Sequence, residues 1–322
     1  MFTIVDTAIG AFLLHQATKD LYFNHDGSIL GVGGMLRTLR HRKDPVIACF
    51  FVGMALSYGA MRLIAPEVLP KYPNMNWDLG TILFALITSI LVGWGTKCCG
   101  GCTSKHILCG LPRLSPPSIV ATIIFFTTAV ATFKLLNPSL ITSACLSNTP
   151  CYLSTPSLVL KSKPLCLLIF LSALAIERLS RLHNPRASTL VFSRRASRTT
   201  YLLCGYTSGL GLLVSGMASP AKVSAFFAFS LFPLDFTKWD PSLLMIILCG
   251  TLPNMARLRW SRYPFATITL RGITWRFVLG AAAFGIGWGA SGICFGTAIL
   301  RAVAQPTWGL LWLVGFWLGD LA

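Results

Sequence analysis

The stretch Gly93–Ser104 reads GWGTKCCGGCTS, and the stretch Gly287–Thr297 reads GWGASGICFGT. Each follows a run of apolar residues, opens with Gly-Trp-Gly and then places a cysteine within a glycine-rich turn. Glycine lets the backbone leave a helix, and irregular backbone at membrane depth is tolerated only where protein or a watery cavity satisfies its polar groups. Paired helix breaks in the two halves of a transport protein point to a binding site. We therefore expect Cys102 and Cys294 to contact a small conducted substrate.

The composition is that of an integral membrane protein. Of the 322 residues, 54% are hydrophobic and 11% are charged, whereas soluble domains carry about 25% charged residues. Lys and Arg number 27 against 10 Asp and Glu, which gives a net charge of +17. Such an excess is typical of cytosolic loops and lipid headgroup contacts, and it also attracts anions. The 11 cysteines do not form a disulfide framework, although Cys145 and Cys151 lie in a polar loop where a bridge would fit.

Apolar spans predict an all-α polytopic membrane fold with about nine transmembrane helices. The spans cover residues 3–19, 45–64, 80–95, 118–136, 164–178, 201–217, 241–256, 275–289 and 306–321. Several are shorter than the roughly 20 residues that a full crossing needs, which suits helices that stop within the membrane and continue as re-entrant segments. Four such segments are expected, namely Asn24–Leu39, Lys97–Ser115, Ala218–Leu231 and Ser291–Ala304.

Two re-entrant segments fall in each half of the chain, which predicts two inverted, pseudo-symmetric halves. We expect residues 1–160 to form the first half, residues 161–200 a linking helix with a basic cytosolic loop, and residues 201–322 the second half. Because Met1–Gly10 contains Asp6 and no basic residue, no cleavable signal peptide is expected.

Basic residues set the expected orientation. The loops after the first, third, fifth and seventh spans, with their flanks, hold 18 Lys and Arg, whereas the other loops hold eight. The positive-inside rule makes the first set cytosolic. The N-terminus then faces outward and the C-terminus lies in the cytosol, in a multi-pass protein expected in the plasma membrane. The Arg-rich loop Arg178–Arg198 lies between two apolar spans and has Phe192 alone of Phe, Tyr and Trp among its arginines, so it fits a topology anchor and no nucleic-acid partner is expected.

The first cysteine turn admits several interpretations. Cys99-x2-Cys102, with His106 and Cys109 nearby, has ligand-like spacing for a metal ion. The same cysteines could form a redox pair, fill space as buried hydrophobes, or line a substrate path. A metal site needs four converging ligands, but here the surroundings are apolar and the second turn offers Cys294 alone. The thiol-lined path is therefore the favoured interpretation, and neither a metal nor another cofactor is predicted.

The chemistry of such a path can be derived from the thiol. A cysteine in apolar surroundings stays neutral at pH 7, and its S–H is a weak donor. It can therefore hydrogen-bond an anion without repulsion and release it again, as conduction requires. Thr103 and Ser104 could add hydroxyl donors, and helix N-termini beside the turns could add N–H groups. The predicted substrate-binding set is Cys102, Cys294, Thr103, Ser104, His106, Cys109, Gly101, Gly292 and Lys222.

Two of these residues have competing interpretations. His106 is either a helix-end histidine satisfied by a carbonyl or a proton relay. Lys222, like Asp240, is a candidate for substrate attraction or for a local ion pair, since intramembrane charge defaults to a functional hypothesis. Trp94 and Trp288 are expected to pack the helices against the broken segments, and Met217 is expected to be a packing residue.

Four stretches together resemble the YeeE/YedE sulphur transport family, in the order in which that family carries them. They are Gly93–Ser115, Ser215–Val223, Trp239–Leu243 and Phe284–Gly296. The resemblance spans nearly the whole chain and implies an inverted-repeat membrane fold that takes up thiosulfate or a related inorganic sulphur compound. In the family, cysteines hydrogen-bond the substrate and relay it through a narrow path, and by motif match these are Cys102 and Cys294.

The chain departs from the family pattern at three places. The first re-entrant turn, Asn24–Gly34, has no cysteine, although some family members carry one there. Lys105 and Ile107 stand where the family usually has glycines, and Phe295 and Thr297 stand where it usually has prolines. These bulkier residues are expected to narrow or reshape the path.

The sequence carries no enzyme signature: Gly-x-Ser-x-Gly, a Walker loop and paired carboxylates are all missing. We therefore expect a transporter of an inorganic sulphur anion, with thiosulfate uptake as the first hypothesis and the lipid bilayer as its setting. A second hypothesis is a non-transporting membrane partner that delivers sulphur or selenium to a bound soluble sulphurtransferase, with the loop Arg178–Arg198 as docking surface.

Overall fold

The computed structural model describes residues 3–24, 30–72, 77–137, 157–182, 194–228, 230–231, 234–235, 239–260 and 273–322. The first half of the chain contributes α1 (Ile4–Asn24), α2 (Val32–Arg42), α3 (Pro45–Ile64), η1 (Pro66–Val68), α4 (Leu79–Cys98), η2 (Ser104–Gly110), η3 (Leu111–Arg113) and α5 (Pro116–Leu136). The helices α7 (Leu158–Lys161) and α8 (Lys163–Leu182) follow.

The second half contributes α9 (Arg194–Val214), α10 (Pro220–Phe227), η4 (Pro241–Leu244), η5 (Ile246–Thr251), α11 (Leu252–Trp260), α12 (Trp275–Ser291), α13 (Phe295–Ala304) and α14 (Pro306–Leu321). Two two-residue strands, β1 (Ser230–Leu231) and β2 (Leu234–Asp235), form one antiparallel pair, with Ser230 opposite Asp235. The predicted all-α class is therefore correct apart from this short pair.

Five helical segments of the described chain are long and apolar enough to cross a membrane. They are Pro45–Ile64, Leu79–Cys98, Pro116–Leu136, Pro241–Arg259 and Trp275–Ala304, the last of which includes the break before α13. The prediction of nine spans is thus confirmed at five places. The other four predicted spans coincide with α1, α8, α9 and α14, which do not meet the same length and composition limits.

Local sequence explains where these helices begin. Asp44 accepts a hydrogen bond from the Val46 N–H at 2.9 Å and caps α3, and Asp78 caps α4 by accepting from the Thr81 N–H at 3.0 Å. Proline occupies the first turn of α3, α5, α10 and α14, where its missing N–H is no loss because the first helical N–H groups have no partner within the helix.

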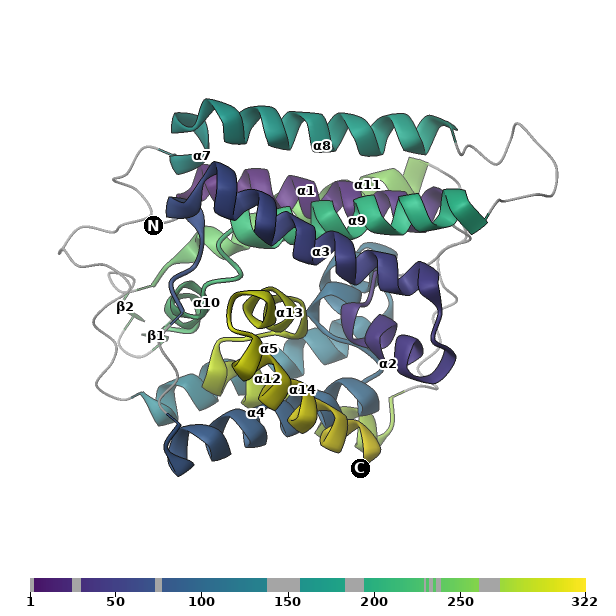
Figure 1. Ribbon diagram of the computed structural model, residues 1–322. Coiled ribbons are helices and arrows are strands. Elements are labelled where there is room, and N and C mark those ends of the chain that lie inside the picture. Colours follow the sequence, from purple (N-terminus) through teal and green to yellow (C-terminus); the bar gives the residue numbers. More distant parts are fainter. Residues whose placement is uncertain are drawn as a thin grey trace.

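The long helices form two layers with short segments between them (Figure 1). One layer holds α1, α3, α8 and α9, and the other holds α4, α5, α12 and α14. Within the layers α3 packs on α9, α9 on α1, α14 on α4, and α12 on both α4 and α5. Between the layers, α13 touches α3 and α9 on one side and α14 on the other, while η2 touches α1 and α5.

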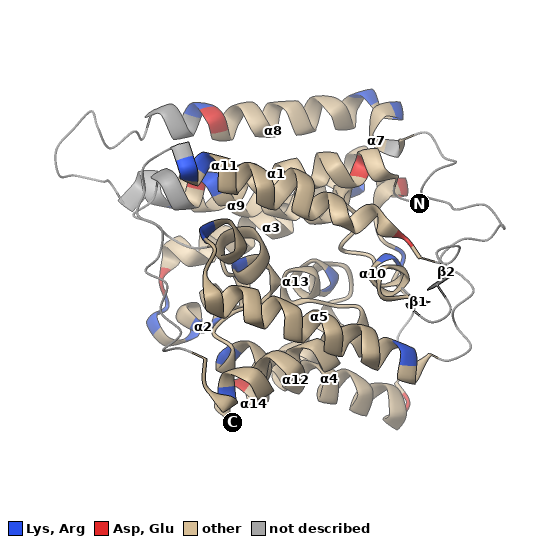
Figure 2. Ribbon diagram, turned by 180° about the vertical axis from the view of Figure 1, so that it is seen from behind, with Lys and Arg blue, Asp and Glu red and all other residues tan. Residues whose placement is uncertain are grey.

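The outer faces of the long helices are apolar. Leu56 on α3, Ile87 on α4, Ile123 on α5, Phe170 on α8 and Val314 on α14 each expose about half of their surface or more. A soluble protein rarely leaves so much apolar surface uncovered, so these faces are suited to lipid. The basic residues of α2 and of the end of α11 lie at the end of the molecule that also carries the C-terminus (Figure 2).

The predicted re-entrant segments correspond to short or irregular elements. Lys97–Ser115 contains the end of α4, a turn, η2 and η3, and Ser291–Ala304 contains a turn and α13. Ala218–Leu231 contains α10. Asn24–Leu39 contains α2, but residues 25–29 of its turn lie outside the described residues, as do Cys145, Cys151 and most of the loop Arg178–Arg198.

Candidate functional site

The two cysteine turns have the same backbone design. Gly100 follows α4 with φ of +73°, and Gly292 follows α12 with φ of +66°. A residue that carries a side chain rarely adopts this left-handed backbone conformation, so glycine is favoured at both positions. In each turn the cysteine comes two residues after this glycine, which gives Cys102 and Cys294 equivalent places. Sequence reasoning selected Gly101 in the first turn, whereas the left-handed residue is Gly100.

Both cysteines are buried at helix junctions. Cys102 exposes 2% of its surface and precedes η2, and Cys294 exposes 4% and is the N-cap residue of α13. Cys102 Sγ lies 3.1 Å from Ser104 Oγ, and Thr297 Oγ1 lies 3.6 Å from Cys294 Sγ. Each thiol therefore has a hydroxyl beside it that fixes its direction.

A central cavity of about 40 Å³ joins the two turns. Thr103 and Ser104 of the first turn and Cys294 and Gly296 of the second line it. Its other walls come from α1, α9, η2, η5, the start of α2 and the segments before α2 and after α9: Leu14, Leu30, Val32, Ile107, Leu108, Ser208, Leu212, Met217 and Ile246. Residues nearly 200 positions apart in the sequence thus face one space, which is apolar except for hydroxyls, a thiol and a thioether.

Cys102 is a neighbour of the other two thiols of the set. It is near enough to Cys294, and also to Cys109, for an electrostatic interaction. Cys109 is buried on η2, and its Sγ lies 3.8 Å from the carbonyl oxygen of Leu30. Three buried thiols are therefore contributed by α13, the first turn and η2.

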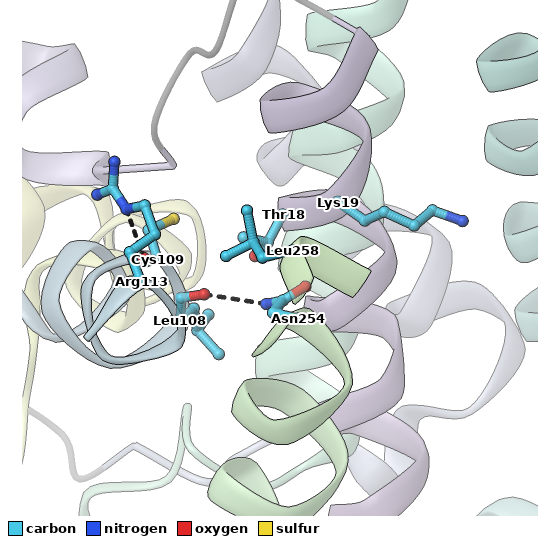
Figure 3. A pocket seen from close by; sticks show the side chains of 7 residues that line it. All are labelled: Thr18, Lys19, Leu108, Cys109, Arg113, Asn254 and Leu258. Atoms are coloured by element: carbon cyan, nitrogen blue, oxygen red, sulfur yellow. Dashed lines mark hydrogen bonds between the residues drawn. The ribbon is translucent and has the colours of Figure 1, made fainter. Parts of the chain in front are cut away.

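A second cavity of about 10 Å³, the inner cavity, has Leu108 among its lining residues (Figure 3). Leu108 lines both cavities. Cys109 on η2 and Arg113 on η3 line one side of this cavity. Thr18 on α1 and Asn254 on α11 line the other. Arg113 Nε donates to the carbonyl oxygen of Cys109 at 2.8 Å.

The η2 segment is a π-helix, as is η5, on which it packs. π-Helical turns are rare and occur often at functional sites. Asn254 Nδ2 donates to the Leu108 carbonyl at 2.9 Å, and Thr251 Oγ1 donates to the Ile107 carbonyl at 3.2 Å. These side chains from the second half satisfy carbonyls that a regular helix would use, so the irregular backbone can persist within an apolar protein.

Six predicted site residues are not among the residues that line the central cavity: Cys102, Cys109, Gly101, His106, Lys222 and Gly292. His106 is buried, its Nδ1 lies 3.1 Å from Ser118 Oγ, and its ring contacts aromatic rings of α5 and α12. Lys222 is buried on α10, and its Nζ donates to Thr7 Oγ1 at 2.6 Å. A Cβ at Gly292 would lie 2.8 Å from the Pro220 carbonyl oxygen, so this glycine permits close packing against α10.

Sequence reasoning missed part of the cavity wall. Ser208 and Leu212 were not selected, because a serine and a leucine within an apolar helix carry no distinctive signal. Met217 was expected only to pack, yet it lines the cavity. Trp288 does pack as expected, against Phe125 on α5 and Phe227 on α10. Within the described part of the chain, no three metal-binding side chains converge.

The fold and its cavities define a multi-pass helical membrane protein with a thiol-bearing interior. Residues 199–320 match the model of a family of unknown function, DUF6691. A protein of Xylella fastidiosa (strain 9a5c) named "Probable transporter" is 33% identical over 125 residues, which are 38% of this chain and 88% of that protein. Another "Probable transporter" of the same strain is 35% identical over 109 residues, covering 31% of this chain and 71% of that protein.

The chain belongs to the family of these Xylella fastidiosa proteins. Because 38% of this chain matches 88% of the first relative, that relative is less than half as long as this chain.

Proposed function

We propose that this protein is a membrane transporter that takes up an inorganic sulphur anion, with thiosulfate as its first candidate substrate. The observation that carries the proposal is the central cavity, where Thr103 and Ser104 of one cysteine turn meet Cys294 of the other. The names of the two relatives and the apolar outer faces of the helices support transport across a bilayer.

The lining suits a soft anion better than a hard cation. Hard cations need several oxygen ligands, usually carboxylates, and no carboxylate lines the central cavity. Neutral thiols and hydroxyls can each donate one hydrogen bond to an anion. A cavity of about 40 Å³ has room for only a few atoms of water size, since one water needs about 10–15 Å³ by this measure. Large organic anions would therefore be excluded.

In the proposed mechanism, thiols pass the anion from one turn to the other. Cys294 receives it in the central cavity, Cys102 holds it next, and Cys109 leads it past Leu108 to the inner cavity. Each thiol binds weakly, because a neutral S–H is a poor donor, so no step traps the ion. Leu108 must move for the ion to pass, and it therefore serves as the gate in this scheme.

Pseudo-symmetry is part of the proposal. The packing of α14 on α4 has its counterpart in the packing of α5 on α12, and the left-handed glycines of the two turns correspond. The clustering of basic residues near α2 and the C-terminus supports the expected orientation, with that end in the cytosol and the N-terminus outside, in the plasma membrane.

The test is uptake of radiolabelled thiosulfate into liposomes that contain the purified protein. We expect Cys102→Ala and Cys294→Ala to abolish uptake without unfolding the protein, whereas Cys49→Ala, on α3 and outside both cavities, should behave like the wild type. Cys294→Ser tests whether a hydroxyl replaces the thiol. Normal uptake by both alanine variants would contradict the proposed thiol relay.

If the intact protein moves no thiosulfate, competition by sulfite, sulfide and selenium compounds separates a different substrate from a missing partner. A soluble sulphurtransferase that co-purifies with the protein, together with flux only in its presence, would favour the delivery hypothesis instead.

A further inference from the structure

A third cavity, of about 260 Å³, lies on the other side of the second cysteine turn. Thr88 on α4, Ser291 at the end of α12, Ile293, and Trp308 on α14 are among its lining residues. Ser291 and Ile293 flank Gly292, and Cys294 comes next and lines the central cavity. The second cysteine turn is therefore the wall between this cavity and the central one.

Arg301 on α13 contributes a guanidinium to this cavity. The residue exposes 9% of its surface, and an arginine keeps its charge in proteins. The ion pairs of the described residues are Lys19 with Glu177 and Arg37 with Asp320, so Arg301 has no carboxylate partner among them. A buried charge without a counter-ion is costly, and in a membrane protein it marks a functional site by default.

The contacts of Arg301 fix its plane and leave donors free. Its Nε donates to Gln305 Oε1 at 3.1 Å. The guanidinium carbon lies 4.1 Å from the ring centre of Trp308 and 5.2 Å from that of Tyr72. Among the described residues, no hydrogen bond to the two terminal nitrogens is present, so their four N–H groups are available. The two aromatic rings hold the planar guanidinium of Arg301 in place, so little side-chain entropy is lost when it binds an anion.

The polar neighbours leave the guanidinium as the principal donor. Thr88 Oγ1 donates to the carbonyl oxygen of Phe84 at 2.8 Å, and Ser291 Oγ donates to that of Gly287 at 2.7 Å. Their hydroxyl hydrogens are thus already used within their own helices. An anion in this cavity would therefore find its donors at the terminal nitrogens of Arg301, in the fork geometry that suits two oxygens of one oxyanion.

We propose that Arg301 is the capture site for the anion. Its guanidinium binds a small divalent oxyanion through two parallel hydrogen bonds before Cys294 receives the anion. This inference rests on the proposed function for its substrate class, but the binding site itself does not require transport. A dianion should bind more tightly than chloride, because it offers more charge and two acceptors to the same fork.

The experiment measures equilibrium binding of radiolabelled thiosulfate to the purified, detergent-solubilised protein, with unlabelled sulfate and chloride as competitors. Arg301→Gln should weaken binding at least about tenfold, the size expected when a charged hydrogen-bond partner is lost, and Arg301→Lys should retain part of the affinity. Arg62→Gln is the matched control, because Arg62 lies exposed on α3. Unchanged affinity in Arg301→Gln would overturn the proposal.

A second pair of variants keeps the test decisive if Arg301→Gln does not fold. Ala290 lines the same cavity, and Ala290→Glu would supply the missing carboxylate, which should pair with Arg301 and exclude the anion. Ala290→Gln has the same size without the charge and should still bind thiosulfate. Equal binding by these two variants would also contradict the capture site.

The two proposals fail in different ways. Cys294→Ala should bind thiosulfate normally and transport none, because capture precedes the thiol step. Binding that depends on Arg301 in a protein without any uptake would keep the capture site and discard transport. Uptake that depends on Cys294 but is indifferent to Arg301 would keep transport and discard the capture site.

Discussion

Two left-handed glycines decide where the cysteines stand. At Gly292 the backbone conformation and the nearby Pro220 carbonyl both exclude a side chain, since a Cβ would come within 2.8 Å of that oxygen. Gly34 on α2 is the opposite case, because a Cβ there would meet nothing within 4 Å.

We expect Gly292→Ala to lower the free energy of unfolding by about 1–3 kcal/mol, the usual range for a strained backbone position, and to displace Cys294. Gly34→Ala should leave stability unchanged or slightly raise it, because alanine favours a helix. Thermal unfolding of the detergent-solubilised variants measures both effects. Equal melting temperatures for Gly292→Ala and the wild type would show that the turn tolerates a side chain.

Single residues also show how far sequence reasoning reaches. Cys294, Thr103 and Ser104 could be predicted, because cysteine and hydroxyl residues beside broken helices stand out in an apolar chain. Arg301 lies within a segment predicted to be re-entrant, and the rule that intramembrane charge is functional would have selected it. Its aromatic neighbours, Tyr72 and Trp308, could not be foreseen, since only the fold brings them together.

Close helix packing depends on glycines that face a neighbouring backbone. A Cβ at Gly205 on α9 would lie 1.9 Å from the Phe50 carbonyl oxygen on α3, and a Cβ at Gly95 on α4 would lie 2.6 Å from the Phe284 N on α12. Small residues at such crossings let membrane helices approach closely. Gly59, on another face of α3, has open space around its Cβ position.

We expect Gly205→Ala to destabilise the protein by roughly 1–3 kcal/mol, because the added methyl group forces α3 and α9 apart. Gly59→Ala should be neutral or stabilising by up to about 1 kcal/mol, since alanine is the better helix former. Resistance to unfolding in a denaturing detergent provides the comparison. A stable Gly205→Ala beside an unstable Gly59→Ala would contradict the packing shown here.

The positions of the helices were largely predictable from the sequence. The number of helices that span the membrane was less so. Hydrophobic runs located α3, α4, α5 and α12, because a lipid-facing helix must be apolar along its length. The helix α1 contains Asp6, Lys19 and Asp20, so its span is ambiguous on composition alone. The π-helical form of η2 and η5 has no sequence signal and depends on partners such as Asn254 from the other half.

The two halves of the whole molecule are interlocked rather than placed side by side. Helix α9 packs on α1 and α3, and α4 packs on α12 and α14, so each half covers apolar surface of the other. The relatives that this chain matches include proteins less than half its length. We therefore expect the two halves of this chain to assemble also when they are separate polypeptides.

We expect that the chain can be divided between α5 and α7, for example after Pro150, and that the two fragments expressed together co-purify and restore thiosulfate uptake. Each fragment alone should be degraded or inactive, because its packing faces would be uncovered. Affinity purification through a tag on one fragment, followed by uptake assays, tests this. Fragments that fold and function singly would show that the halves are independent.

The helix α8 runs the length of the molecule beside α1 and α9 (Figure 1). It carries the chain from one end of the molecule to the other, so α9 begins at the end opposite to the start of α1 (Figure 1). Two half-length polypeptides could each insert with their own polarity and need no such helix. A single chain that joins two oppositely inserted halves needs an odd number of crossings between them, and we propose that α8 supplies it.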